Sequence, residues 1–384
     1  MKESKKYYIL IHGMAGGHGG IESFIMNVFR NLNDNKSIHM DFLCNEPNPY
    51  ENEIINAGSK VFYIPGKTKS PIKYRLALEQ FFKENSSSYD CIWDNESSLA
   101  NIDYIKLAKK YGIKRRIIHS HTTSNVFKGI KKPVVNFLQK EHKKNIDQIA
   151  TDFWACSKDA AKWMFPTRVF ENTKVINNGI NIEKMQFDEK KRNLIRHKLQ
   201  LDDKKYVIGT VGRISPEKNQ SFLLDVMYEL VKKDNRFRFV LVGDGPIKKE
   251  LKQKITKLNL QNYVILAGLQ TNTQAWYSSF DCFVLPSKFE GQSVSGLEAQ
   301  ANGLPVLVST GAHPDDLKIN SDNFVSLDLS EGTQAWTNNI IYMSKKMHRC
   351  TKKYINENFK LRKMDILSTS SMIRDYLLND NEIK

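Results

Sequence analysis

Cysteine is scarce in this chain of 384 residues, and the five that occur are scattered singly: Cys44, Cys91, Cys156, Cys282 and Cys350. There is no Cys-x-x-Cys pair and the count is odd, which argues against a disulfide framework and against a structural zinc site. We expect most of these thiols to be small core side chains in a reducing compartment.

Long apolar runs are also missing. No uninterrupted stretch approaches the roughly 18–20 residues that a membrane-spanning helix needs. The N-terminal sequence MKESKKYYILIHGM has a basic start, but its apolar run is only YYILI. We interpret it as the first strand of a sheet rather than a signal peptide, and expect a cytoplasmic protein.

Acidic residues almost disappear between positions 106 and 144, where Glu141 is the only one. The formal net charge of +16 favours anionic partners. We predict that this span docks on an anionic membrane leaflet, where each nearby cation contributes about 1 kcal/mol; an ordinary solvated surface is the alternative. Nucleic acid is disfavoured, because no recognition motif or interleaved aromatics accompany the charge. The basic residues are Lys106, Lys109, Lys110, Lys114, Arg115, Arg116, Lys128, Lys131, Lys132, Lys140, Lys143 and Lys144.

The length fits two domains, and strand-like and helical patterns alternate in two series. The first series starts with a strand over 7–14 and a helix over 21–32, and the second starts with a strand at 206–211. This spacing predicts an α/β protein with two parallel, doubly wound sheets. The expected parts are a domain over 1–180, a charged linker over 181–203, a domain over 204–355 and a terminal helical segment over 356–384 that returns to the first domain.

The segment FEGQSVSGLEAQANGLPV (289–306) contains two glutamates eight residues apart, Glu290 and Glu298. An apolar run typical of a buried parallel strand precedes it, and a helix that ends at Gly303 follows. Glu290 is therefore expected at the carboxyl end of a strand, where open α/β sheets bind ligands, and Glu298 on the helix. Their carboxylates can accept hydrogen bonds from sugar or ribose hydroxyls. Without this context, both acids would be ordinary surface residues.

Backbone N–H groups near the start of that helix can hold a phosphate, which makes Gly291, Gln292, Ser293 and Val294 candidates. In VGRISPEKN (211–219), Arg213 and Lys218 lie in a loop after a strand. Two cations there can neutralise a pyrophosphate, although a pair of surface cations is the plain alternative.

Two further strand ends carry candidates. LVGDGP (241–246) contains Gly243 and Gly245, which permit a tight turn and close backbone approach. AGLQT (267–271) places Leu269 after the next strand. Alone, each is a common turn between strand and helix.

The turn GMAGGHGGIE (13–22) is glycine-rich but lacks the G-x-G-x-x-G register, so we reject a nicotinamide enzyme. HSHTT (119–123) places His121 at a strand end, where a lone histidine is more often structural. No D-x-D pair follows a strand, and the pair Asp315-Asp316 stands alone. We predict no metal and no cofactor, because the two cations and helix N-termini can neutralise a leaving diphosphate.

Taken together, these motifs resemble retaining nucleotide-sugar glycosyltransferases of family 4, which have the GT-B fold of two Rossmann-like domains. The resemblance covers nearly the whole chain and is strongest over 211–308. The opening segment, HSHTT and INNGIN (176–181) look like the bacterial capsular and exopolysaccharide branch. That branch implies transfer of a hexosyl or N-acetylhexosaminyl group from a UDP-sugar to a lipid-diphosphate-linked saccharide at the inner face of the plasma membrane.

The resemblance also implies residue roles. Arg213 and Lys218 would contact the donor diphosphate, Glu290 a donor-sugar hydroxyl and Glu298 the ribose, while His121 would reach the donor sugar from the opposite domain. No residue is assigned as nucleophile, because the donor phosphate can serve as the base. Glu22 would face the acceptor, or would simply favour its helix N-terminus. The remaining donor-binding candidates are Gly19, Gly20, Gly243, Gly245, Leu269, Gly291, Gln292, Ser293 and Val294.

The sequence departs from the family pattern in two places. Many relatives have a Gly-Phe/Leu-Gly type sequence after the first glutamate, where this chain has Gln292 and Ser293, so the donor sugar is not predicted. After the strand at Val306, relatives often carry a Gly-Gly pair and an acidic residue; the stretch 309–316 matches that pattern poorly, so no residue in it is assigned a role. Two alternatives stay open. One is a non-catalytic scaffold that docks a partner glycosyltransferase at the membrane; the other is a nucleotide-sugar epimerase, which the paired glutamates fit poorly.

Overall fold

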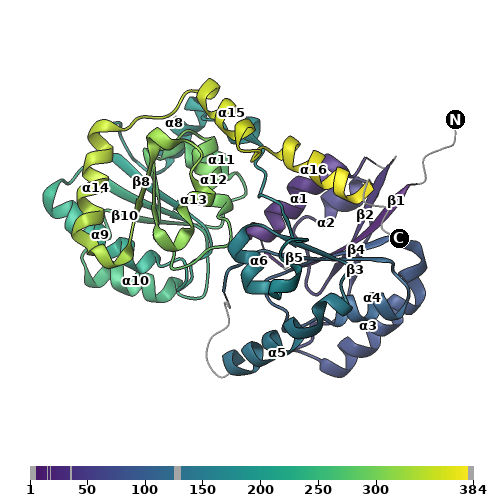
Figure 1. Ribbon diagram of the computed structural model, residues 1–384. Helices are drawn as coiled ribbons and strands as arrows, with labels where there is room; N and C mark the ends of the chain where they lie inside the picture. The colour runs from purple at the N-terminus through teal and green to yellow at the C-terminus, as the bar shows by residue number, and fades with distance from the viewer. Residues whose placement is uncertain (1–5, 15, 18, 35–36, 125–130, 379–384) are drawn as a thin grey trace. The chain divides into compact units, whose positions relative to one another are not determined.

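The chain forms two compact units in its computed structural model, one of Met1–Gly179 with Ile366–Lys384 and the other of Ile180–Asp365. The structure describes residues 6–378 except for 15, 18, 35–36 and 125–130. Figure 1 shows both units and labels many of their helices and strands.

The first unit is built on a seven-stranded sheet in the order β3-β2-β1-β4-β5-β6-β7. Every neighbouring pair of strands is parallel. The strands are β1 (Tyr7–His12), β2 (Ile38–Cys44), β3 (Val61–Tyr63), β4 (Cys91–Glu96), β5 (Arg115–Ser120), β6 (Asp152–Ala155) and β7 (Lys174–Val175). The helices are α1 (Gly20–Leu32), α2 (Glu51–Asn56), α3 (Pro71–Asn85), α4 (Asp103–Lys110), α5 (Lys131–Asn145), α6 (Lys158–Met164) and α16 (Ile366–Leu378).

Alternate side chains of the central strands belong to two separate cores, one on each face of this sheet. In β1, Ile9 and Ile11 join the core that contains Phe24 of α1, whereas Leu10 joins the core that contains Leu78 of α3. A strand that is apolar on both faces is typical of a parallel sheet covered by helices. The sequence prediction of a doubly wound sheet is confirmed here.

Helix α16 returns to the first unit and lies beside α1 (Figure 1). Its Ile373 and Leu377 are fully buried in the same core as Phe24. Arg374 adds an ion pair with Asp34 at 3.1 Å. The helix before it, α15 (Lys352–Leu361), belongs to the second unit.

The second unit has a six-stranded sheet in the order β10-β9-β8-β11-β12-β13, again parallel throughout. Its strands are β8 (Tyr206–Val211), β9 (Phe237–Val242), β10 (Val264–Gly268), β11 (Cys282–Leu285), β12 (Val306–Ser309) and β13 (Phe324–Leu327). Besides α15, its helices are α7 (Ile182–Met185), α8 (Glu189–Lys198), α9 (Gln220–Lys233), α10 (Lys248–Lys257), α11 (Thr273–Ser279), α12 (Val294–Ala301), α13 (Pro314–Leu317) and α14 (Gly332–Lys346).

The segment expected as a linker, 181–203, is part of this second unit and contains α7 and α8. Ile182, Met185 and Ile195 are buried in the core of the second unit. A few apolar side chains are therefore enough to attach a segment that is otherwise charged. Arg196 is also buried and pairs with Asp281, so its charge is compensated. In the described part of the chain, no helix combines the length and the apolar character needed to cross a bilayer.

Gly209 lets the end of α11 pack directly against β8. A Cβ at this position would overlap the ring of Phe280, which is fully buried. We expect Gly209→Ala to lower the free energy of unfolding of the second unit by about 1–3 kcal/mol, because the overpacked core must shift. Urea denaturation measures the change.

Gly296→Ala is the matched control. Its Cβ would meet the nearest atoms at 3.6 Å, an ordinary contact, and it lies inside α12, where alanine favours the helix by roughly 1 kcal/mol. Stability should be unchanged or raised. A Gly209→Ala protein as stable as the wild type would show that this contact does not constrain the sheet.

Candidate functional site

The loops that follow β8, β9 and β11 are joined at the carboxyl edge of the second sheet by backbone hydrogen bonds. The N–H of Ile214 donates to the carbonyl of Asp244 at 2.9 Å. The N–H of Lys288 donates to the carbonyl of Glu217 at 2.8 Å. Three strand ends therefore form one connected surface, as the position of the motifs predicts.

Gly243 and Gly245 are required for this close approach. Gly243 has φ +140°, and a Cβ there would overlap the carbonyl oxygen of Gly212. A Cβ on Gly245 would overlap the carbonyl oxygen of Ile214. The predicted reason for these two glycines, a tight turn with close backbone contact, is what the geometry requires.

Lys218 and Glu290 meet across this surface. The Lys218 Nζ lies 2.5 Å from Glu290 Oε1, and the Ser287 hydroxyl donates to the same oxygen at 2.6 Å. The two charged side chains are only 23% and 11% exposed, so the pair is partly desolvated. Sequence analysis named both charged residues but missed Ser287, whose position directly after an apolar strand was the available signal.

Arg213 lies in the same loop as Lys218 and is exposed. The buried side chain of Gln220 holds the loop from within by donating to the Arg213 carbonyl at 2.8 Å. The guanidinium thus stands at an accessible edge of the surface while its backbone is fixed. Leu269 is likewise exposed, at 66%, directly after Gly268 with its φ of +70°.

Helix α12 begins at Val294 and supplies the helix predicted after Glu290. Ser293 caps it, since its hydroxyl accepts from the N–H of Gly296 at 3.3 Å. Gly291, Gln292 and Ser293 are all buried in the turn that leads into the helix.

Glu298 points from α12 to Tyr277 of α11. The fully buried Tyr277 hydroxyl donates to Glu298 Oε2 at 2.9 Å. Burial raises the pKa of Glu298 to about 7, against the lowering effects of the Tyr277 hydrogen bond and the positive charge of Lys184. Sequence analysis did not find Tyr277, because an aromatic residue in a short helix has the same pattern as a core residue.

His121 follows β5 in the first unit. It is half-buried, and its Nε2 lies 2.9 Å from Asn95 Oδ1. Burial lowers the pKa of His121 to about 3, so the imidazole is neutral at physiological pH. His119 is fully buried and stacks on Trp93, with ring centroids 5.9 Å apart. Of the two histidines, His121 is the accessible one.

Gly20 starts α1 and Gly19 is the N-cap residue before it; both are exposed. Glu22 is buried in the first turn of this helix, with its carboxylate close to Gly19, where a Cβ would overlap it. The side chain therefore folds back over the helix N-terminus, where a negative charge is favourable. This geometry is consistent with the interpretation that Glu22 favours its helix N-terminus; its role toward an acceptor stays a prediction.

One group in the described residues has three side chains of metal-ligating type within 4.8 Å of one another: His12, Asp94 and Glu96. It lies at the carboxyl ends of β1 and β4. The His12 Nδ1 is 2.6 Å from Asp94 Oδ1 and 3.7 Å from Glu96 Oε1. Burial and the Asp94 charge raise the pKa of Glu96. Sequence analysis named none of the three, and its expectation that no metal is needed stays a prediction.

Several cations of the basic span 106–144 are engaged inside the first unit. Arg115 pairs with Asp152 at 2.7 Å, and Arg116 and Lys143 donate to backbone carbonyls. Lys106, Lys114 and Lys140 are exposed and have no recorded ion pair among the described residues. Lys128 lies outside the described residues, as do the side chains of Lys131 and Lys132.

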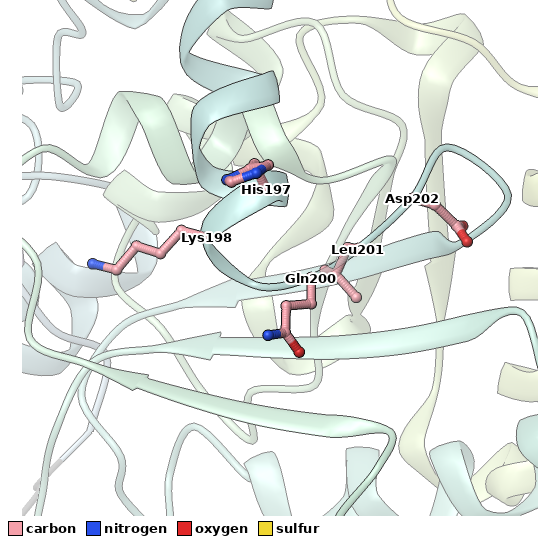
Figure 2. A pocket seen from close by; sticks show the side chains of 5 residues that line it. All are labelled: His197, Lys198, Gln200, Leu201 and Asp202. Atoms are coloured by element: carbon pink, nitrogen blue, oxygen red, sulfur yellow. The ribbon is translucent and has the colours of Figure 1, made fainter.

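A concave surface near the start of β8 lies away from these motifs. It is lined by His197, Lys198, Gln200, Leu201 and Asp202, shown as sticks in Figure 2. These residues precede the amino end of β8, whereas the candidate residues follow its carboxyl end. Six strand residues, roughly 20 Å of extended chain, separate the two edges.

Residues 191–333 match the family described as glycosyl transferases group 1. The putative glycosyltransferase EpsF of Bacillus subtilis (strain 168) is 29% identical over 340 residues, 86% of each chain. The UDP-Gal:alpha-D-GlcNAc-diphosphoundecaprenol alpha-1,3-galactosyltransferase of Escherichia coli is 34% identical over 138 residues, 35% of this chain and 36% of that protein.

Solved structures share the architecture. The Anabaena Alr3699/HepE structure in complex with UDP-glucose superposes with a TM-score of 0.79 at 18% identity, over 97% of this chain and 99% of that one. Sucrose-phosphate synthase from Thermosynechococcus elongatus gives 0.75 at 16% identity, over 97% and 98%. At these identities the likeness shows the fold, and it confirms the predicted GT-B fold.

The partly desolvated Lys218–Glu290 pair should be energetically coupled. In a double-mutant cycle with Lys218→Met and Glu290→Gln, we expect a favourable coupling energy of about 1–2 kcal/mol, measured by chemical denaturation. The control is the pair Asp244–Lys248, at 2.5 Å but with side chains 42% and 30% exposed. Solvent screening should make its coupling clearly weaker than that of the Lys218–Glu290 pair. Equal coupling in the two pairs would contradict the inference.

Proposed function

We propose that this chain, a GT-B glycosyltransferase of the group 1 type, moves a sugar from a UDP-sugar to a lipid-diphosphate-linked saccharide with retention of configuration, in surface polysaccharide biosynthesis. The observation that carries the proposal is the connected edge of the second sheet, where Lys218, Glu290 and Glu298 all lie within the matched segment 191–333. Similar proteins support it: one of the solved structures is a complex with UDP-glucose, and one relative is named as acting on a diphosphoundecaprenol-linked sugar.

In this proposal Lys218 and Arg213 bind the donor diphosphate. Lys218 already contacts Glu290, but an ammonium group has three donors, so two N–H bonds remain for phosphate oxygens. Arg213 offers a planar fork from its exposed position. The two cations stabilise the charge that develops on the diphosphate as the glycosidic bond breaks, and make a metal ion unnecessary.

Glu290 binds a hydroxyl of the donor sugar, and Glu298 binds the ribose. In the reaction, the bond between the anomeric carbon and the diphosphate oxygen breaks, and the acceptor oxygen forms a new bond to that carbon. The acceptor proton passes to the leaving phosphate, so no enzyme nucleophile is required. The buried turn of Gly291, Gln292 and Ser293 lies between Glu290 and α12, and the transferred group in this proposal is a hexosyl or N-acetylhexosaminyl group.

We assign the acceptor to the first unit. His121 is neutral at physiological pH, so it can serve a substrate as a hydrogen-bonding group rather than as a cation. Gly19 and Gly20 present exposed backbone at the start of α1, suited to a close approach by substrate. Glu22 contributes chiefly by stabilising that helix N-terminus.

We further propose that the protein is peripheral at the inner face of the plasma membrane, and that α5 is the docking element. Val134 and Phe137 on its outward face are 59% and 62% exposed, next to the exposed Lys140 and Lys144. A helix face that combines apolar and basic side chains suits an anionic lipid surface.

Arg213→Ala and Lys218→Ala should each reduce turnover by roughly 10²-fold or more, because each removes a preorganised donor to the developing charge. A screen of UDP-sugars for slow hydrolysis first identifies the donor, and steady-state transfer assays then measure both variants. Lys257→Ala, an exposed cation of α10, is the control and should be fully active. Near-normal rates for both site variants would refute these roles.

Calorimetry with UDP separates this enzyme from the alternative of a non-catalytic scaffold. Binding by the wild type that is weakened in Arg213→Ala supports the enzyme. An absence of UDP binding would favour the scaffold. The anomeric configuration of the product, read by NMR against that of the donor, tests retention separately.

Membrane docking is tested by liposome sedimentation. We expect the wild type to bind vesicles with anionic lipid, and its binding to fall as salt screens the lysines. Phe137→Ser with Lys140→Glu should reduce the bound fraction at least several-fold. Leu194→Ser with Lys190→Glu, exposed positions on α8 in the second unit, is the matched control. Equal binding to neutral and anionic vesicles would exclude the proposal.

A further inference from the structure

Tyr277 and Glu298 form a hydrogen-bonded pair that the proposed chemistry does not by itself explain. The Tyr277 ring is fully buried between α11 and the sheet, packed against Phe280 and Phe283 with ring centroids 6.0 and 5.9 Å apart. Its hydroxyl lies 2.9 Å from Glu298 Oε2 and 3.3 Å from the Ser295 carbonyl oxygen. A ring fixed in this way leaves the hydroxyl little freedom to point elsewhere.

We propose that Tyr277 is a positioning residue for the nucleoside: it holds Glu298 ionised and oriented, so that the carboxylate accepts hydrogen bonds from the ribose hydroxyls of the bound nucleotide. This inference rests on the proposed function. Among the described residues, Tyr277 is the only side chain recorded in a hydrogen bond with Glu298, and it engages Oε2. Glu298 itself is partly exposed, which leaves Oε1 for a ligand.

The phenol has one proton to donate and two acceptors within reach. When Glu298 is ionised, the phenol donates its hydrogen bond to the carboxylate, because hydrogen bonds to a charged acceptor are the stronger ones. When Glu298 is protonated, its own O–H can donate to the phenol oxygen, and the phenol can then donate to the Ser295 carbonyl. The second arrangement leaves a neutral acid, which is a weaker acceptor for ribose hydroxyls.

Few other charges act on this pair. Burial disfavours the ionised form of Glu298, whereas the Tyr277 hydrogen bond and the positive charge of Lys184 of α7 favour it. The other elements packed against α12, which are β11, β12 and α15, bring no further charged group to Glu298 among the described residues. With the pKa of Glu298 raised to about 7, the carboxylate titrates near neutrality, and loss of the Tyr277 hydrogen bond moves this titration to higher pH.

The test is the pH dependence of UDP affinity in Tyr277→Phe, measured by calorimetry between about pH 6 and 9. We expect the variant to bind UDP about 3–10-fold more weakly than the wild type near pH 7, and within about twofold near pH 9, where Glu298 is ionised in both proteins. Because UDP itself titrates near neutral pH, the quantity compared is the affinity ratio of two proteins at the same pH.

Two further variants exclude a merely structural effect. Tyr206→Phe removes another buried phenol hydroxyl of the same unit, one that forms no hydrogen bond with Glu298 in the part of the chain that the structure describes, and its affinity ratio should stay near one at every pH. In a Glu298→Gln background, where nothing titrates at this position, Tyr277→Phe should produce no pH-dependent change. A ratio for Tyr277→Phe that is constant with pH, or a pH dependence that persists in the Glu298→Gln background, overturns the inference. If the wild type binds no UDP at any pH, the proposed function itself has failed.

Discussion

The carboxyl edge of the second sheet depends on a contact between opposite charges, Lys218 and Glu290. The two residues come from the loops after β8 and β11, which are neighbours in the sheet. Each side chain is mostly removed from water, and a lone charge in such a place is costly, so each makes the other tolerable. The backbone bond between Lys288 and Glu217 fixes the same two loops, so the pair is held in place rather than assembled only when a ligand arrives.

Preorganisation of this kind has a consequence for phosphate binding. If Lys218 were a free surface lysine, its flexible stem would have to be ordered by the ligand at an entropic cost. Here that ordering has already occurred in folding. Glu290 nevertheless offsets part of the lysine's charge, so a second cation is needed to neutralise a diphosphate. In the proposed function, Arg213 supplies this second charge; it is exposed, and Gln220 anchors its backbone.

The parts of this site that follow from local sequence could be predicted, and those that follow from packing could not. The glycines at 243 and 245 and the spacing of Glu290 and Glu298 are readable, because a strand, a turn and a helix fix them locally. Tyr277 is different: its hydroxyl matters only because α11 packs beside α12, and no spacing in the sequence records that. The same holds for 181–203, whose charge suggests a linker although three buried apolar residues attach it to the second unit.

Burial shifts the pKa values of two ionisable groups, His121 in the first unit and Glu298 in the second, in opposite directions. Removal from water disfavours the charged form of either group, so it lowers the pKa of His121 to about 3 and raises that of Glu298 to about 7. Across the range from pH 6 to 8, His121 therefore stays neutral and cannot act as a general acid by losing a proton. In the second unit, Glu298 changes charge in that range, while its phenol partner, whose own pKa burial raises further, does not.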